Sequence, residues 1–523
     1  MSLTLVSLPP GWLAVALREL GQWTGGGTPS KFEPSFWRGG SIPWVSPKDM
    51  KVPRIRQTED SITERALEES PAKLIPAGSV LVVTRSGILA HSLPVAVTEV
   101  PVTVNQDLKA FIPTGVATPE YVAAALRSAA QQILATCSKD GTTVQSVDTS
   151  KLLAHKILVA PIPEQRRIVD AIDSYLSRLD EAEAALERVR RNLKRYRAAV
   201  LQAAVEGRLV PTEAELARAE GRDYEPASQL LKSILADRQR RWEQAEYARL
   251  KAAGKTPRDE QWKAKYREPT RLEMAALPSL PEGWCWVAMS ALCAIEPQNG
   301  IYLPKTDYGD GMPILRIDDY QIDRSRGAEE FQRVRIPATD AAKYALHDGD
   351  LVINRVNSPS HLGKALVVGS KHLPAIFESN MMRIQLTESL VPAFVEKYLN
   401  STGGKARLTK NAKWAVNQAS INQRDVVSTP VPLPPLVEQG RIVAEVERLF
   451  SLSESTLAAV TQAGLHTSRL RQSTLKWAFE GKLVDQDPND EPASVVLERI
   501  QAERAMQDLT PIGASRGRNR RER

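Results

Sequence analysis

The sequence is organised around a stretch that reads PEQRRIVDAIDSYLSRLDEAEAALERVRRNLKRYRAAVLQAAVEGRLV, residues 163–210. Its apolar residues recur at alternating four- and three-residue steps, which predicts a long helix with one narrow apolar seam. The two ends of the stretch return as VEQGRIV at 437–443 and EGKLV at 480–484, and the register between them holds without a gap. The chain therefore contains two copies of one long helix.

The two seams are expected to pack on each other as a coiled coil, because either seam alone would leave an apolar stripe in water. The alternative is that each helix packs only on the globular part that precedes it. The seam residues are Ile168, Ile172, Tyr175, Leu179, Ala182, Leu186, Val189, Leu193, Tyr196 and Val200 in the first helix, and Ile442, Val446, Leu449, Ser453, Thr456, Val460, Ala463, Thr467, Leu470, Thr474 and Trp477 in the second.

The globular parts repeat as well. LPPGW at 8–12 returns as LPEGW at 280–284, AGSVLVVTRSG at 77–87 parallels DGDLVINRVNS at 348–358, and the proline-alanine-serine triplet at 226–228 recurs at 492–494. Chance likeness does not explain so many echoes in the same order at a nearly constant offset. Since even the segment after each helix is repeated, the chain is close to a circular permutation of itself.

We predict an α+β fold in which two mixed α/β heads are joined by two long antiparallel coiled-coil helices, as a pseudo-two-fold internal repeat. The runs 80–84 and 351–354 are predicted as strands, and 119–128 and 392–401 as helices. The expected boundaries are a first head at 1–160, a first helix at 161–210, a charged helical connector at 211–279, a second head at 280–434, a second helix at 435–484, and a C-terminal helix with a basic tail at 485–523.

The composition excludes several classes of protein. With 42% hydrophobic and 25% charged residues among 523, the chain is an ordinary globular mixture, and its net charge of +7 is compatible with nucleic acid. No apolar run reaches the ~18–20 residues that span a bilayer, and the N-terminus lacks the basic start of a signal peptide. Cys137, Cys285 and Cys293 form neither a disulfide framework nor a zinc pattern, so we expect a cytoplasmic protein.

Several motifs in family order resemble a type I restriction–modification specificity subunit. They are TGGGTPSKFEPSFWRGGSIPWVSPKDM at 24–50, GTTVQSV at 141–147, EQRRIV at 164–169 and EGRLV at 206–210. The resemblance implies that each head is a target-recognition domain reading one half of a split, asymmetric site in double-stranded DNA. It also implies that the two helices are conserved spacers that dock two methyltransferase subunits, through which restriction subunits join.

The resemblance further implies a non-catalytic subunit that binds no cofactor, with S-adenosylmethionine, ATP and magnesium on the partner subunits. The sequence itself has no G-x-x-x-x-G-K-[ST] loop, no Asn-Pro-Pro-aromatic motif and no HExxH among its six histidines. Two alternatives stay open: a nuclease or DNA-modifying enzyme with an unrecognised site, and a structural adaptor that never contacts DNA.

The candidates for DNA contact lie in loops at strand ends, where a scaffold presents side chains. Arginine pairs with guanine and asparagine with adenine through two hydrogen bonds, but a surface ion pair, a phosphate contact or plain turn chemistry is the alternative for these residues. Trp37 and Trp44 are expected in the core. The candidates are Ser30, Lys31, Arg85, Ser86, Thr142, Thr143 and Gln145 in the first head, and Arg355, Asn357, Lys410, Lys413, Asn417 and Gln418 in the second.

Overall fold

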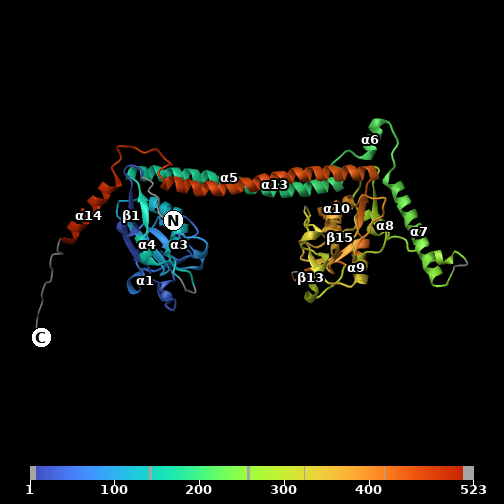
Figure 1. The fold of residues 1–523 in the computed structure, drawn as a ribbon, viewed down its shortest axis with the longest axis horizontal. Coiled ribbons are helices and arrows are strands. Elements are labelled where there is room, and N and C mark those ends of the chain that lie inside the picture. Colours follow the sequence, from blue (N-terminus) through green and yellow to red (C-terminus); the bar gives the residue numbers. More distant parts are fainter. Residues whose placement is uncertain (1–7, 140–143, 256–258, 323, 417, 510–523) are drawn as a thin grey trace. The chain divides into compact units, whose positions relative to one another are not determined.

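The computed structural model describes residues 8–139, 144–255, 259–322, 324–416 and 418–509 (Figure 1). The chain divides into two compact units, one made of Met1–Leu186 with Gln462–Arg523 and the other of Glu187–Thr461. The first unit thus combines the beginning and the end of the chain, in keeping with the near circular permutation of the sequence.

The first head is built on a five-stranded sheet in the order β2-β9-β6-β7-β4 and a three-stranded sheet in the order β5-β3-β8. The central strand β6 reads VLVV and is fully buried, as a continuous apolar run predicts. The strands are β2 (Gly21–Gly25), β3 (Ile42–Val45), β4 (Arg54–Ile55), β5 (Asp60–Ile62), β6 (Val80–Val83), β7 (Val95–Thr98), β8 (Thr103–Val104) and β9 (Leu108–Pro113).

The second head repeats this plan with a four-stranded sheet in the order β12-β19-β15-β17 and a three-stranded sheet in the order β14-β13-β18, and it adds a small sheet in the order β16-β21-β20. Its strands are β12 (Gln298–Asn299), β13 (Tyr308–Leu315), β14 (Gln332–Val334), β15 (Leu351–Asn354), β16 (Val356–Asn357), β17 (Ala365–Val367), β18 (Ile376–Phe377), β19 (Met381–Ile384), β20 (Lys413–Ala415) and β21 (Gln418–Ser420).

Each head is closed by pairing its first strand with its last. Strand β1 (Leu13–Ala16) pairs antiparallel with β10 (Lys156–Val159), and β11 (Cys285–Ala288) pairs antiparallel with β22 (Pro430–Leu433). Two-stranded pairs tolerate the prolines of β22, since an edge strand need not donate from every residue. The long helix follows directly in both copies.

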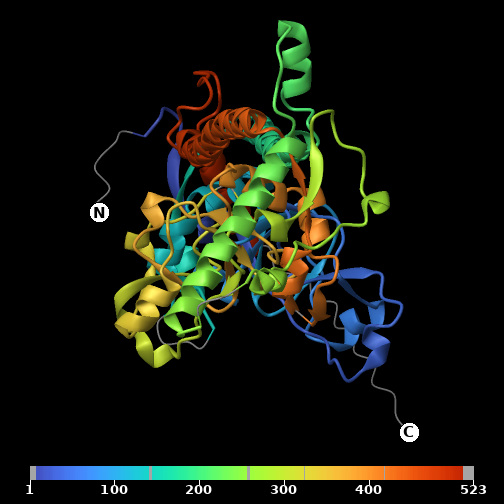
Figure 2. The same ribbon diagram turned by 90° about the vertical axis from the view of Figure 1, so that its right-hand side faces the viewer.

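The predicted strands and helices are confirmed to within a residue by β6, β15, α2 (Pro119–Ser128) and α10 (Pro392–Asn400). Helix α7 (Ala227–Ala252) begins beside the second head (Figure 2). Its Leu230 and Ile234 belong to the apolar core of that head. The other α-helices are α1 (Glu64–Glu69), α3 (Ala130–Cys137), α4 (Thr149–Ala154), α6 (Glu213–Glu220), α8 (Met289–Leu292), α9 (Ala338–Tyr344), α11 (Thr402–Leu408), α12 (Gln423–Val427) and α14 (Ala493–Leu509).

The two long helices α5 (Ile162–Val205) and α13 (Leu436–Phe479) have 44 residues each and lie side by side (Figure 1). In the first unit Arg471 of α13 forms an ion pair with Asp180 of α5. In the second unit the Arg197 Nε of α5 donates to the Ser453 Oγ of α13 at 3.0 Å. Further along α5 in the second unit, Ala204 clusters with Ile442, which lies nearer the start of α13 than Ser453, so the predicted antiparallel pairing is present.

One position of the seam in α13 is covered along the whole helix, since Val446, Ser453, Val460, Thr467 and Thr474 are buried at steps of seven residues, and the other seam position is more open. Ile168 and Ile172 belong to the core of the first head, and Ile442 and Val446 to a cluster with the end of α5 and the second head. The prediction of a buried seam is wrong for Leu470, which is 50% exposed, because in a pair of only two helices the side chains that flank the contact line stay open to water. Tyr175, Val189, Tyr196 and Trp477 are exposed for the same reason, whereas Val460 is buried and Leu179, Leu186, Leu193 and Leu449 are half-buried.

Candidate nucleic-acid interface

A buried tryptophan–glutamate pair fastens each head to its helix. The Trp12 Nε1 donates to the Glu164 Oε2 at 3.0 Å, and the Trp284 Nε1 donates to the Glu438 Oε1 at 2.8 Å. Both carboxyl groups are fully buried, and this burial raises the pKa of Glu164 and of Glu438. The repeated LPxGW and EQ motifs thus supply the tryptophan and the glutamate of the same hydrogen bond in each copy.

The glutamine of the EQ motif adds a second connection. In the first head the Gln165 Oε1 accepts from the Thr118 N at 2.9 Å, and in the second the Gln439 Oε1 accepts from the Val391 N at 3.0 Å. Thr118 and Val391 immediately precede helices α2 and α10. Each long helix thus fixes the start of the helix that covers its own head's sheet.

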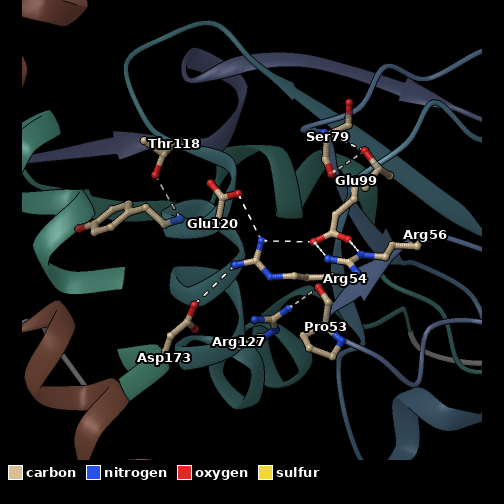
Figure 3. Close-up of polar contacts among 11 residues, drawn as sticks. Pro53, Arg54, Arg56, Ser79, Glu99, Thr118, Glu120, Arg127 and Asp173 are labelled. Atoms are coloured by element: carbon tan, nitrogen blue, oxygen red, sulfur yellow. Dashed lines mark hydrogen bonds and ion pairs between the residues drawn. The ribbon is translucent and has the colours of Figure 1, made fainter. Parts of the chain in front are cut away.

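An arginine network holds the outer strand of the first head (Figure 3). The Arg54 guanidinium lies 3.7 Å from the carboxylates of both Glu99 and Glu120, and 3.5 Å from that of Asp173 on α5. Nearby, the Arg127 Nη2 donates to the Pro53 carbonyl at 3.2 Å. Strand β4 is at one edge of the sheet and β2 at the other, so this network lies at the edge opposite the glycine-rich loop that follows β2.

In the first head, the loop after β6 is joined by its main chain to two distant segments. The Thr84 N and Arg85 N donate to the Asp107 carbonyl at 2.8 and 3.2 Å, and the Ser86 N donates to the Gln145 carbonyl at 3.1 Å. The Arg85 Nε also donates to the Asp107 Oδ1 at 2.6 Å. Residues that lie about 60 positions apart in the sequence are therefore neighbours at one surface.

The glycine-rich loop between β2 and β3 joins the same surface. The Gly27 N donates to the Val104 carbonyl at 3.0 Å, and the Thr28 hydroxyl hydrogen-bonds the Gln106 side chain. Gln106 directly precedes Asp107, which contacts Arg85. Four segments meet here, namely 26–33, 84–87, 105–107 and 144–147, and we call them the first loop platform.

The second head builds the corresponding surface with the same connections. The Arg355 N and Val356 N donate to the Asn380 carbonyl at 2.8 and 3.2 Å, and the Ile421 N donates to the Arg355 carbonyl at 2.9 Å. Asn357 pairs with Ala419 between strands β16 and β21. The segments 300–305, 355–357, 378–380 and 418–421 form what we call the second loop platform.

A groove of about 890 Å³ opens beside the second platform. The Arg355 Nη1 donates to the Ser379 carbonyl at 3.1 Å at its wall, and the Arg316 Nε donates to the Glu378 Oε2 at 3.2 Å. Planar amide and guanidinium groups beside aromatic rings suit contact with base edges and phosphates. The polar and aromatic lining consists of Tyr302, Lys305, Tyr308, Arg316, Phe331, Gln332, Arg333, Glu378, Ser379 and Asn380.

Most of the candidates that the structure describes are brought together on the platforms. Arg85, Ser86 and Gln145 meet in the first head, and Arg355, Asn357 and Gln418 in the second. Arg85 is compatible with both a surface ion pair and a DNA contact, since it pairs with Asp107 while its side chain stays 56% exposed. Thr142, Thr143 and Asn417 lie outside the described residues.

The remaining candidates that the structure describes are exposed. Ser30 and Lys31 are in the glycine-rich loop, where the Ser30 carbonyl accepts from the Trp37 Nε1 at 3.0 Å and so takes part in ordinary turn chemistry. Lys413 is exposed on β20, and Lys410 is exposed after α11, with no hydrogen bond between its side chain and the platform among the described contacts. Trp44 is buried, which confirms its place in the core, and the half-buried Trp37 packs against it at that core's margin with the two ring centroids 5.2 Å apart.

The sequence analysis missed the segment that links each platform to its sheet. This segment is Asn105–Gln106–Asp107 in the first head and Glu378–Ser379–Asn380 in the second. In both copies a polar triplet directly precedes or adjoins a strand of buried apolar residues, β9 or β19, and this repeated triplet is the signal that could have identified it.

Other features of the described residues bear on chemistry. Within them, no group of three or more His, Cys, Asp and Glu is arranged to hold a metal ion. Over the same part of the chain, no helix has the length and apolarity needed to cross a membrane. The three cysteines are free thiols, and burial raises the pKa of Cys285 to about 11 and that of Cys293 to about 12.

Comparison with known proteins identifies relatives of one kind. Residues 9–189 match the family described as the type I restriction modification DNA specificity domain. Over 159 residues the chain is 47% identical to the type I restriction enzyme EcoR124I/EcoR124II specificity subunit of Escherichia coli, a match covering 30% of this chain and 39% of that subunit. It is 25% identical to the EcoKI specificity subunit of E. coli strain K12 over 378 residues, or 70% of this chain and 67% of the relative.

Solved structures share the fold. The HsdS subunit of Thermoanaerobacter tengcongensis aligns with a TM-score of 0.52 at 19% identity, covering 92% of this chain and 100% of that one. A chain from a structure of the type I restriction–modification system aligns with a TM-score of 0.56 at 20% identity, covering 91% and 99%. These structures confirm the α+β fold with two long helices and a pseudo-repeat, and the family match and the curated relatives confirm the resemblance drawn from the sequence.

Proposed function

We propose, on the premise that the chain is a type I restriction–modification specificity subunit, that it is the non-catalytic subunit that reads DNA for a methyltransferase complex. One observation carries the proposal: both heads build the same loop platform, in which the loop after the central strand is joined by main-chain hydrogen bonds to two distant segments, and this loop carries Arg85 in the first head and Arg355 in the second. A scaffold that is repeated in detail while its side chains differ is suited to reading two different sequences.

We propose that each head reads one half of a split site. The first platform presents Arg85 and Gln145, whereas the second presents Arg355, Asn357 and Gln418. Arginine favours guanine and asparagine or glutamine favours adenine, because each pair can form two hydrogen bonds in the major groove. Since the two sets of side chains differ, the two half-sites are expected to differ and the whole site to be asymmetric.

The partners follow from the repeat. Each unit offers a head, paired segments of both long helices and a post-helix segment, so two methyltransferase subunits have two similar surfaces to occupy. We propose that restriction subunits join through them, and that S-adenosylmethionine, ATP and magnesium are held by these partners in the cytoplasm.

The test is a head exchange read out by methylation. The chain is co-expressed with its methyltransferase subunit, and methylated positions are mapped in the host DNA. Replacing residues 1–160 with the head of another specificity subunit should change one half-site and leave the other intact. A change in both half-sites, or methylation that no longer depends on this chain, would contradict the proposal.

A separate measurement addresses the adaptor alternative. A DNA-reading chain that neutralises several phosphates should lose affinity steeply as salt rises, with a slope that counts those phosphates. An adaptor without DNA contact should show no such binding. Methyl transfer or DNA cleavage by the purified chain alone would instead support the enzyme alternative.

A further inference from the structure

We propose that each head inserts one exposed aromatic side chain, Phe32 in the first and Tyr302 in the second, between base pairs of its half-site. This inference rests on the proposed function, because it assigns a role at the same platforms. The insertion would unstack one base step and bend the duplex toward the head. Apolar side chains that act as such wedges are a known device of DNA-bending proteins.

Phe32 is the more extreme of the two. Its side chain is 98% exposed, although the burial of a phenylalanine ring away from water stabilises a folded protein. The loop that carries it is well fixed: the Phe32 N donates to the Ser30 Oγ at 3.3 Å, and Trp37 ties the Ser30 carbonyl to the buried Trp44. The ring is therefore held out in water by a constrained backbone.

The glycines of this loop explain how the backbone is placed. A Cβ atom at Gly26 would collide with the Val104 carbonyl, and one at Gly27 would lie 2.6 Å from the Pro71 carbonyl. Only glycine permits the loop to run this close to the sheet. The close approach fixes the start of the loop, so that the aromatic residue follows from a rigid base.

Tyr302 occupies the corresponding loop of the second head, between β12 and β13. Its neighbours Ile301 and Leu303 both pack against an apolar cluster, so the alternation of an extended chain directs Tyr302 outward, where it is 78% exposed. Gly300, which precedes them, again has no room for a side chain against the Glu378 carbonyl. Two loops of different length and sequence thus present the same kind of side chain.

The surroundings favour DNA as the occupant over a protein partner. Lys31 adjoins Phe32 and is exposed, and Lys305, Arg316 and Arg333 share the groove with Tyr302. Cationic side chains around an aromatic one can bind the phosphates that flank an opened base step. Both loops also belong to platforms that carry the candidate base-reading side chains.

The experiment uses the full chain and a duplex of about 40 base pairs that carries the site found by methylation mapping. 2-Aminopurine, whose fluorescence rises when it is unstacked, replaces one base at a time in each half-site. Wild type should raise the fluorescence at one step per half-site. Phe32→Ala should abolish the rise in one half-site only and weaken binding roughly 10-fold, the effect of losing one base–aromatic contact.

Matched variants separate this role from others. Phe32→Trp keeps an aromatic ring and should retain the fluorescence rise. Val52→Ala, an exposed apolar residue before the opposite edge strand β4, should change nothing. Because no charge is removed, Phe32→Ala should keep the salt dependence of binding, whereas Lys31→Ala should reduce its slope by about one.

The outcomes are distinguishable. If wild type binds the methylated site but neither Phe32→Ala nor Tyr302→Ala alters affinity or fluorescence, the insertion is refuted and the proposed function stands. If these variants lose methyltransferase subunits while binding DNA normally, the aromatic residues serve a protein contact and the inference is equally refuted. Failure of the wild type to bind DNA at all would refute the proposed function itself.

Discussion

Arg85 allows the sharpest test of base reading in the first head. Its backbone is fixed by the Asp107 carbonyl, and its Nε is held by the Asp107 carboxylate at 2.6 Å, so the terminal nitrogens are directed away from that contact. A guanidinium oriented in this way is prepared to form two hydrogen bonds with the O6 and N7 atoms of guanine. Asp107 is in turn held by the Asn105 Nδ2 at 3.1 Å.

The expected effect of Arg85→Ala follows from this geometry. One bidentate contact discriminates against the wrong base by about 1–3 kcal/mol, which corresponds to roughly 5- to 150-fold. The loss should be confined to one base pair of one half-site, and Arg85→Lys should not restore it because an ammonium group lacks the planar fork. Asp107→Asn should cost less than Arg85→Ala, since it weakens the orientation of the arginine without removing it.

The assay is competition binding of the full chain to a panel of duplexes that carry every base at each position of the site. Arg56→Ala is the control, because Arg56 is also exposed and ion-paired, with Glu99, but lies just after β4 at the far edge of the sheet. If Arg85→Ala weakens all duplexes equally and lowers the salt slope by about one, Arg85 contacts phosphate and the base-reading argument is wrong. Unchanged binding would remove Arg85 from the interface altogether.

Three further predictions follow from other parts of the chain. Lys413→Ala, on the exposed strand β20 beside Trp414 (61% exposed), should weaken binding to all duplexes equally and lower the salt slope by about one; a base-specific loss would contradict a phosphate role. Removing Leu179–Ala185 together with the opposite seven residues, 465–471, shortens the helix pair by about 10 Å. In methylation assays the preferred gap between half-sites should then become shorter by up to roughly three base pairs. Removing only one of the two stretches should instead destabilise the protein. Glu164→Gln should become more stable relative to wild type as the pH rises above 4.5. Burial raises the pKa of Glu164 in the folded chain, so the unfolded chain releases this proton first and wild type loses stability as the pH rises through that range. A difference in melting temperature that does not change with pH would contradict this role of the Glu164 carboxyl group.

The sequence was sufficient for the long helices and for the heads' central strands. The four-three spacing predicts helices of matching length, and both run for 44 residues with their first residues at equivalent repeat positions. The continuous apolar runs at 80–83 and 351–354 are the buried strands β6 and β15. These elements depend on local periodicity, which one sequence displays directly.

The platforms depend on contacts that no local pattern reveals. Arg85 and Gln145 were separate candidates in the sequence, and only the bridge between the loop after β6 and the segment before α4 makes them neighbours. Phe32 and Tyr302 were not predicted as contact residues because the two loops that carry them differ in length, so the internal repeat is weakest at these positions. The predicted burial of Leu470 is wrong for the opposite reason: its heptad position is clear from the sequence, but a single partner helix does not cover its side chain.

The contacts within each unit explain what the internal duplication achieves. The Gly11 carbonyl accepts from the Ala493 N at 3.0 Å in the first unit, and the Gly283 carbonyl accepts from the Ala227 N at 2.8 Å in the second. Each head is thus completed by the segment that follows the other copy's helix, and the first core contains Ala478 and Leu497 from the far end of the chain. Two copies of a single half-chain could form these contacts only as a symmetric dimer with identical heads, and the DNA site of such a dimer would have to be a palindrome. Fusion into one chain keeps every shared contact and lets each loop platform change alone, which is what the proposed reading of an asymmetric site requires.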